Sequence, residues 1–443
     1  MYRTLLEDLG KWHRSSDRKS LILSGSRQVG KTWLVREFAR LNNLELIEIN
    51  FEETPKMVSI FAASLKPEDI VTAIELTLNR RIILEKSLLF FDEVQQCPIA
   101  ITALKHFTDH KCRLPVIATG SYLGLLEGKT EGISQPIGYV EELKLFPMNF
   151  DEYLLATDPH PALAEAMENH SKLTPVVHER LLSLYREYLF VGGLPQVVAT
   201  WLNGLKAKDS LLLLIQTVRA LQKKLLAEYK ADFAKYHPRD ALNIARTWEF
   251  VAENLSRSLS EVKRFTFKDK IPGKRGYGDF ANYFIRLEAC GLIYRSFVTD
   301  TPVYPLKSQK KDSLFKCFYF DSGLLLSEMD FEYTALNPDK DIIYKGPIAE
   351  NFIAGELVRL GISPFSYVKS NSTAEIEFLI QKDGKIIPIE VKNNNPSAKS
   401  LAWFMKEFDP VVAIKFSNSI GSISEKVKHY PIYLCHQVLK KTF

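Results

Sequence analysis

The sequence predicts an α/β protein in which a parallel sheet, covered by helices on both faces, is followed by a helical part and a smaller α/β part. Short apolar strands alternate with helical stretches through the first 150 residues. Such strands are typical of a parallel sheet that is buried on both faces. The pattern becomes helical near residue 149 and changes again near residue 339. With 443 residues, 46% of them hydrophobic and 25% charged, the chain is long enough for several globular domains.

A complete G-x-x-x-x-G-K-T pattern lies between the first predicted strand, residues 21–24, and a helix that begins near residue 33. Its members are Gly25, Ser26, Arg27, Gln28, Val29, Gly30, Lys31 and Thr32. In this context backbone N–H groups surround a phosphate at the positive end of a helix dipole. Lys31 is expected to reach the β- and γ-phosphates, and the Thr32 hydroxyl to bind Mg²⁺. The pattern predicts an ATP site, since no guanine-reading motif accompanies it.

The later strands of this sheet are expected at residues 44–51, 87–93, 115–121 and 139–146. Polar side chains end two of them, and ligands bind at the carboxyl ends of such strands. We expect Asp92 to hold Mg²⁺ through water, Glu93 to polarise the attacking water, and Thr119 to sense the γ-phosphate. The alternative is that Asp92 and Glu93 are ordinary loop residues.

The chain divides by its pattern into four parts and a linker. Residues 1–148 form the expected nucleotide-binding core, and residues 149–237 are predicted to be a helical lid or connector with a sharp break at 191–195. Residues 238–312 are the third part and residues 313–338 a linker. Residues 339–443 form the last part, a small α/β domain.

The third part is predicted to contain helices followed by a hairpin of strands at 291–298 and 303–306. That order is the order of a winged helix, with the helix that begins at Gly278 as the recognition element. Residues 257–312 carry 12 Lys and Arg against six Asp and Glu, a local net charge of +6. A basic face of this kind favours nucleic acid as partner, with DNA the first candidate. The alternatives are a solvated helical surface, or a winged helix that binds protein.

The last part carries a second group of candidate residues. Glu377 and Glu390 lie on two strands joined by a turn at Asp383-Gly384, and Lys392 shares the face of Glu390 because strands alternate with period two. Together with Glu350 on the preceding helix, the carboxylates could bind a divalent metal that activates water, with Glu390 and Lys392 as catalytic groups. The alternative is ordinary Glu–Lys pairing across neighbouring strands.

Taken in order, these motifs give the chain a family resemblance over nearly its whole length. The residues that carry it are Ser24–Thr32, Phe91–Gln95, Ala118–Ser121, Leu145–Tyr153, Gly192–Pro195, Asp321–Leu325, Glu375–Leu379 and Pro388–Lys392. The chain resembles prokaryotic AAA-type ATPases with a C-terminal domain of unknown function. The resemblance implies an ATPase core, a winged helix, and a C-terminal domain similar to the PD-(D/E)XK nucleases, a restriction-endonuclease-like α/β fold.

Two positions depart from the family pattern. Family members usually have Gly-Arg before the fifth strand, where this chain has Gly138-Tyr139. The absence of an arginine that could stabilise the γ-phosphate predicts slow ATP turnover, unless another arginine takes its place. The first hairpin acid is usually Asp, and here it is Glu377, one methylene longer. That change predicts weakened or lost nuclease activity.

Composition excludes several classes of protein. The five cysteines form no metal-binding cluster and fit a reducing compartment, and residues 1–20 lack the apolar stretch of a secretory signal. No apolar run is long enough for a membrane span, so a cytoplasmic protein is expected. Three functions remain open: an ATP-driven switch acting on nucleic acid, a metal-dependent nuclease with an ATPase regulator, and a signalling ATPase that binds protein. An oligomer is compatible with each.

Overall fold

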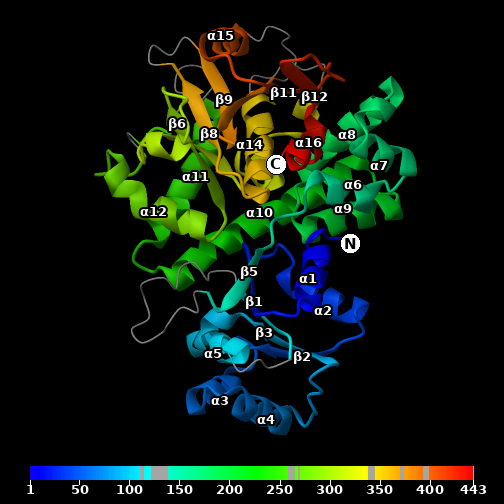
Figure 1. Ribbon diagram of the computed structural model, residues 1–443, viewed down its shortest axis with the longest axis vertical. Coiled ribbons are helices and arrows are strands. Elements are labelled where there is room, and N and C mark those ends of the chain that lie inside the picture. The colour runs from blue at the N-terminus through cyan, green and yellow to red at the C-terminus, as the bar shows by residue number, and fades with distance from the viewer. Residues whose placement is uncertain are drawn as a thin grey trace. The chain divides into compact units, whose positions relative to one another are not determined.

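A computed structural model describes residues 1–109, 114–120, 138–257, 265–267, 270–337, 345–369, 374–392 and 399–442 (Figure 1). The chain forms two compact units. The first comprises residues 1–146 with 289–291, and the second residues 147–288 with 292–443. The mixed α/β fold agrees with the predicted class.

The first unit is built on a five-stranded parallel sheet in the order β2-β3-β4-β1-β5. Its strands are β1 (Ser20–Ser24), β2 (Glu45–Asn50), β3 (Ser87–Asp92), β4 (Val116–Gly120) and β5 (Val140–Lys144). Its helices are α1 (Leu5–Arg14), α2 (Lys31–Leu41), α3 (Val58–Ala63), α4 (Pro67–Leu78) and α5 (Pro98–Asp109). All five predicted strands are confirmed. Because the strands are parallel, the loops that follow β1, β3 and β4 share one edge of the sheet.

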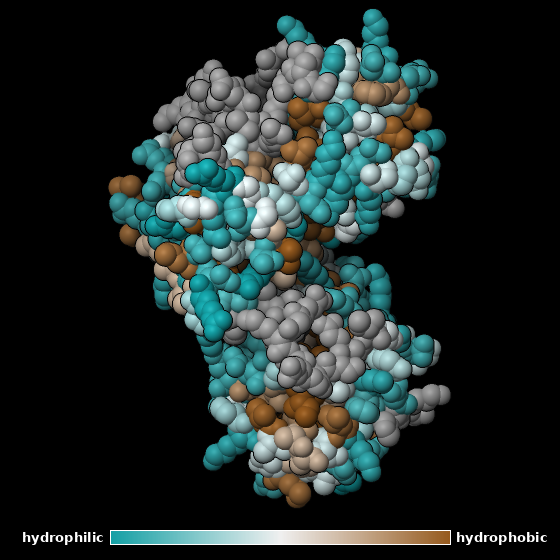
Figure 2. Space-filling model, turned by 90° about the vertical axis from the view of Figure 1, so that its left-hand side faces the viewer, coloured by the Kyte–Doolittle hydropathy of each residue, from teal (hydrophilic) through white to brown (hydrophobic). Residues whose placement is uncertain are grey.

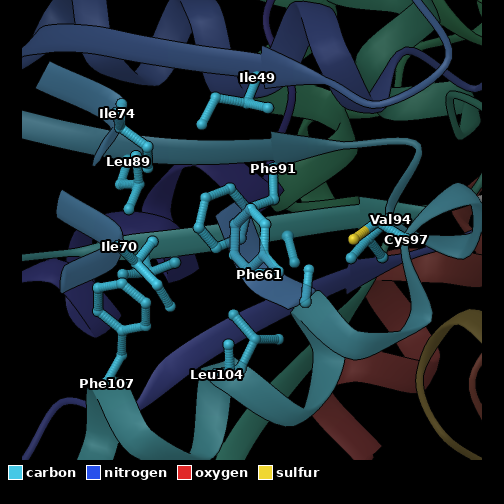
Figure 3. Packing of buried hydrophobic residues seen from close by; sticks show 14 of the residues in the cluster. Ile49, Phe61, Ile70, Ile74, Leu89, Phe91, Val94, Cys97, Leu104 and Phe107 are labelled. Carbon is cyan, nitrogen blue, oxygen red and sulfur yellow. The ribbon is translucent and has the colours of Figure 1, made fainter. Parts of the chain in front are cut away.

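A hydrophobic cluster holds β3 and its neighbours against α3, α4 and α5 (Figure 3). Every residue of β3 is buried, which explains its continuous apolar sequence. The rings of Phe51 and Phe91 both lie edge-on to Phe61, with Phe61–Phe91 centroids 5.2 Å apart. This packing fixes the strand whose last residue is Asp92.

The second unit begins with helices. They are α6 (Phe150–Thr157), α7 (Pro161–Glu168), α8 (Pro175–Val191), α9 (Pro195–Ala207), α10 (Leu211–Tyr236), α11 (Ala241–Arg257), α12 (Tyr277–Ala289) and α13 (Ser322–Glu328). A reciprocal pair of bonds starts α6, in which Asn149 accepts from the Glu152 N–H and Glu152 accepts from the Asn149 N–H. The long helical runs predicted before residue 237 are confirmed as helices.

The predicted break at residues 191–195 has a packing reason. Gly193 lies so close to another chain segment that a Cβ there would be 2.1 Å from the Met148 carbonyl oxygen. Its N–H donates to the buried Asp321 carboxylate at 2.7 Å, and Asp321 also accepts from the Leu324 N–H at the start of α13. Two turns that are far apart in sequence therefore interlock.

The second unit also contains a seven-stranded mixed sheet in the order β12-β11-β10-β9-β8-β6-β7. Its strands are β6 (Ile293–Thr299), β7 (Phe315–Tyr319), β8 (Phe365–Val368), β9 (Glu375–Lys382), β10 (Lys385–Val391), β11 (Ala413–Ser417) and β12 (Val427–Pro431). Its helices are α14 (Lys345–Arg359), α15 (Lys399–Phe408) and α16 (Cys435–Thr442). The predicted hairpin β9–β10 is confirmed, with both turn residues, Asp383 and Gly384, at positive φ.

The strand predicted at residues 303–306 is wrong. The partners of β6 are β7 on one side and β8 on the other, and residues 306–309 form a short 3₁₀ helix. Pro302 and Pro305 carry no N–H and cannot donate to a strand ladder. The two-stranded wing is therefore not formed by these residues. The sheet crosses the limits predicted at residues 312 and 338, and the segment predicted as a linker contains β7 and α13.

Candidate functional site

The loop between β1 and α2 has the backbone shape that phosphate binding requires. Gly25, at φ +143°, approaches the Leu145 carbonyl so closely that a Cβ would lie 2.2 Å from that oxygen. Gly30, at φ +95°, is the N-cap of α2, and Gln28 also has positive φ. Ser26 and Val29 are buried, whereas Arg27 is exposed. The loop is therefore held by its backbone, and only glycine fits at Gly25.

Lys31 places its ammonium inside this loop. Its Nζ donates to the carbonyl oxygens of Gly25 and Ser26, each at 2.9 Å. Burial lowers the pKa of Lys31 to about 8, an effect that the carboxylates of Glu93 and Asp92 partly oppose. A buried ammonium with this pKa is stabilised by any anion that enters the loop.

Asp92 joins the ends of two strands to the loop. Its carboxylate accepts a hydrogen bond from the Thr32 hydroxyl at 2.9 Å and a second one from the Thr119 hydroxyl. Asp92 and Thr119 are both buried. A hydroxyl beside a carboxylate provides the oxygen ligands that Mg²⁺ prefers, so these residues fit the ion that the loop implies. Ser121, expected at the end of the same strand as Thr119, lies outside the described residues.

Glu93 follows Asp92 with left-handed backbone, at φ +52°. Burial raises the pKa of its carboxyl, although the Gln95 amide donates a hydrogen bond to it. A carboxylate whose pKa is raised accepts a proton more readily, which suits a general base. Gln95 was not predicted as a site residue, and its position two residues after Glu93 was the only signal.

Arg3 is a second residue that the sequence did not reveal. Its side chain is buried, and its guanidinium donates to the Val29 carbonyl at 2.8 Å and to the Phe146 carbonyl at 2.6 Å. These two bonds tie the phosphate loop to the chain that follows β5. An arginine close to the start of a charged segment gives no sequence signal of this role.

Tyr139 does not bear on the γ-phosphate within one chain. The residue after it, Val140, pairs with Ser20 at the start of β1, whereas the phosphate loop follows Ser24 at its end. The separation along the strand is therefore on the order of 15 Å. The prediction of slow turnover from the missing arginine loses its physical reason, because that position lies at the opposite edge of the sheet.

The structure brings Glu377, Glu390 and Lys392 together. Lys392 Nζ lies 2.8 Å from Glu377 Oε1 and 3.7 Å from Glu390 Oε1. Glu377 also accepts from the Val391 N–H at 3.1 Å. Burial and the neighbouring Glu377 charge raise the pKa of Glu390 to about 7. Neither carboxylate oxygen of Glu390 has a hydrogen-bond partner among the described residues.

Glu350 contacts a different lysine. Lys316 of β7 lies 2.9 Å from Glu350 Oε2 and 2.6 Å from Glu375 Oε1. Burial favours the neutral amine of Lys316, but the charges of these two carboxylates and of Glu377 raise its pKa overall. Lys316 and Glu375 were not predicted. A lysine within a strand of otherwise buried residues was the available signal for the first, and its spacing of two from Glu377 for the second.

The predicted metal ligands of this half contact lysines in the structure. Among the described residues, no three His, Cys, Asp or Glu side chains are arranged to hold a metal ion. Glu350, Glu377 and Glu390 are instead shared between two lysines. The nearby segments 370–373 and 393–398 lie outside the description.

Several cations of the basic segment have acidic partners. The buried Lys270 pairs with Glu253 at 2.8 Å, Arg286 with Asp240 at 2.6 Å, and Arg295 with Glu288. Exposed basic residues on the described part of the segment include Arg275, Lys307 and Lys311. Residues 258–264 and 268–269 lie outside the description. The charge available to a partner is therefore smaller than the sequence count of +6.

Three family models match the chain. Residues 17–154 match an AAA domain. Residues 182–334 match a domain of unknown function (DUF8612), and residues 345–433 match another (DUF4143). The AAA match together with the loop geometry implies nucleotide binding, for which Mg²⁺ is the usual companion.

Three solved structures are similar at low identity. The Walker-type ATPase paby2304 of Pyrococcus abyssi is 16% identical over 73% of this chain and 94% of its own, with a TM-score of 0.44. The Orc1 protein of Aeropyrum pernix, solved in complex with DNA, is 13% identical over 75% and 91%, with a TM-score of 0.28. Cdc6p from Pyrobaculum aerophilum is 14% identical over 75% and 94%, with a TM-score of 0.25. These scores are too low to carry an inference. No curated protein matches the chain.

No helix among the described residues combines the length and the apolar sequence that crossing a bilayer requires.

Proposed function

We propose that this chain is a Mg-ATP-dependent switch whose AAA domain controls a nucleic-acid-binding, nuclease-like C-terminal half. The observation that carries the first part is the arrangement of Lys31, Thr32, Asp92 and Thr119 at one edge of the parallel sheet. Lys31 is hydrogen-bonded to carbonyl oxygens of the loop, and the Thr32 hydroxyl is hydrogen-bonded to the Asp92 carboxylate at the end of β3. This is the set that a phosphate-binding ATPase needs.

Each of these residues has a separate task in the proposal. Lys31 binds the β- and γ-phosphates in place of the carbonyl oxygens that it now contacts. Thr32 and Asp92 hold Mg²⁺, which supplies charge stabilisation of the transferring phosphate when bound. Glu93, held by Gln95, accepts the proton of the attacking water. Thr119, whose hydroxyl donates a hydrogen bond to the Asp92 carboxylate, senses the γ-phosphate.

The decisive experiment for the ATPase is hydrolysis measured with and without DNA. Wild type is expected to release phosphate only with Mg²⁺, and Lys31→Ala to lose nucleotide binding. Lys56→Ala is a matched control, because Lys56 is an exposed lysine of the same unit. Equal hydrolysis by wild type and Lys31→Ala would exclude the proposed site.

The nucleic-acid part of the proposal depends on the exposed cations of the basic segment. On the part of the second unit that Figure 2 shows, most of the residues drawn in colour are hydrophilic. On this proposal the doubly substituted Lys307→Ala/Lys311→Ala protein binds DNA more weakly, and the slope of log affinity against log salt falls by about two. The double variant Lys206→Ala/Lys208→Ala removes two exposed lysines elsewhere and should change neither quantity.

The switch itself predicts that DNA affinity depends on bound nucleotide. ATP should change the affinity of wild type and leave that of Lys31→Ala unchanged. The same DNA affinity with and without ATP, at low and at high salt, would contradict the switch but not the ATPase.

A second candidate function is a signalling ATPase whose C-terminal half binds protein. The pairing of Lys270, Arg286 and Arg295 with acids favours it, since these cations are engaged within the chain. Capture of partners from a lysate that survives nuclease treatment, together with no measurable DNA binding, would select this candidate.

A further inference from the structure

The C-terminal carboxylate cluster contains two internal cations. Four glutamates contribute to it: Glu350 on α14, Glu375 and Glu377 on β9, and Glu390 on β10. Two lysines contact them, Lys316 of β7 and Lys392 after β10. In Figure 1, α14 is the yellow helix beside β8 and β9. The cluster thus joins α14 to the strands β7, β9 and β10, and β7 is not a direct neighbour of the other two in the sheet.

Lys316 lies where its ammonium bridges two of these carboxylates. Its distances of 2.9 Å to Glu350 and 2.6 Å to Glu375 are those of charge-assisted hydrogen bonds. The Lys316 side chain is only 9% exposed, so water does not replace these bonds. The charged groups that surround the Lys316 ammonium are Glu350, Glu375 and Glu377. Because all three are acidic, the buried positive charge of Lys316 is compensated.

From this geometry we infer that Lys316 is a built-in replacement for a divalent metal, and that the cluster binds no Mg²⁺ or Mn²⁺. Mg²⁺ is held by one or two carboxylates that have no other partner, and it keeps several waters. Glu350 is engaged by Lys316, and both oxygens of Glu377 are engaged by Lys392 and the Val391 N–H. Only Glu390 lacks a hydrogen-bond partner among the described residues, and it is fully buried away from the solvent that would supply those waters. The metal that the nuclease resemblance implies therefore does not fit the residues present.

The inference deepens the proposed function by assigning the nuclease-like half to binding rather than cleavage. Without a metal the cluster cannot activate water by lowering its pKa. The lysines instead tie α14, β7 and β9 together. This assignment rests on the nuclease-like reading of the C-terminal half, but its test uses neither ATP nor DNA.

The test measures Mn²⁺ binding to the full chain without nucleotide, with electron paramagnetic resonance as the readout. All proteins carry Thr32→Ala, which removes the hydroxyl ligand of the ATP site. The parent protein and the same protein with Glu377→Gln are expected to bind Mn²⁺ equally weakly. Lys316→Met removes the bridging charge at similar side-chain length and should increase Mn²⁺ affinity by about a hundredfold or more. Adding Glu377→Gln to Lys316→Met should abolish that gain.

The matched control is Lys270→Met. Lys270 is also a buried lysine paired with a glutamate, but it lies outside the cluster, so its replacement should create no Mn²⁺ site. A parent protein that binds Mn²⁺ and loses it with Glu377→Gln would overturn the inference. So would a folded Lys316→Met protein that gains no affinity. If Lys316→Met does not fold, the comparison of the parent with Glu377→Gln still decides.

Discussion

The pH dependence of nucleotide binding should report on the buried ammonium of Lys31. Lys31 is 6% exposed, and burial lowers its pKa from 10.5 to about 8. The shift corresponds to about 3 kcal/mol of unfavourable burial of the charged form. The folded protein therefore carries this cost below pH 8 and escapes it as pH rises, because the amine then loses its proton.

Bound nucleotide reverses this situation. The phosphates supply negative charge beside Lys31 Nζ and raise its pKa again, so binding takes up one proton whenever the free amine is neutral. Affinity for ATP should be constant below pH 8 and should fall above it. The expected fall is about tenfold at pH 9 and about 30-fold at pH 9.5.

The assay is titration of a fluorescent ATP analogue at constant Mg²⁺ and ionic strength from pH 7 to 9.5. Calorimetry at pH 9 in two buffers of different ionisation enthalpy should detect uptake of close to one proton. Lys31→Arg is the matched control, since a guanidinium remains charged throughout this range. The reasoning is refuted if wild-type affinity is flat to pH 9.5, or if Lys31→Arg shows the same decline.

Three further predictions follow from the two units. Asp92→Asn should weaken Mg²⁺-dependent hydrolysis by roughly tenfold to a hundredfold, because the residue bonded to Thr32 no longer carries charge, and phosphate release against Mg²⁺ concentration will show it. Glu93→Gln should slow hydrolysis by about a hundredfold or more while ATP binding stays intact; equal losses of both would contradict its role as base. Gly193→Ala should destabilise the second unit by about 1–3 kcal/mol, since its Cβ would collide with the Met148 carbonyl, and urea unfolding measures this. An unchanged midpoint would mean that the turn moves freely.

The proposed nucleotide site could be predicted from the sequence because it is built from short local patterns. The phosphate loop lies within eight residues, and Asp92, Glu93 and Thr119 each end an apolar strand. Parallel strands bring their carboxyl ends to one edge, so the sequence order alone places these residues together. The hydrogen bonds from Thr32 and Thr119 to Asp92 confirm that placement.

The second sheet could be predicted only in part. The hairpin β9–β10 was visible because its turn and its alternation are local. The pairing of β6 with β7 and β8 was not, because β6 and β8 are joined by more than 60 residues of chain. Strand alternation states which face is buried, but it does not state which strand becomes the neighbour.

The sequence by itself determined the type of the first sheet, the phosphate loop and the carboxylates at its edge. Only the tertiary structure decided that Arg3 braces that loop, that Tyr139 lies at the far edge of the sheet, and that Lys316 reaches Glu350. Each of these facts depends on residues distant in the chain. Periodicity and spacing describe a residue's immediate neighbours, whereas a buried charge finds its partner only when separate elements pack together and exclude water.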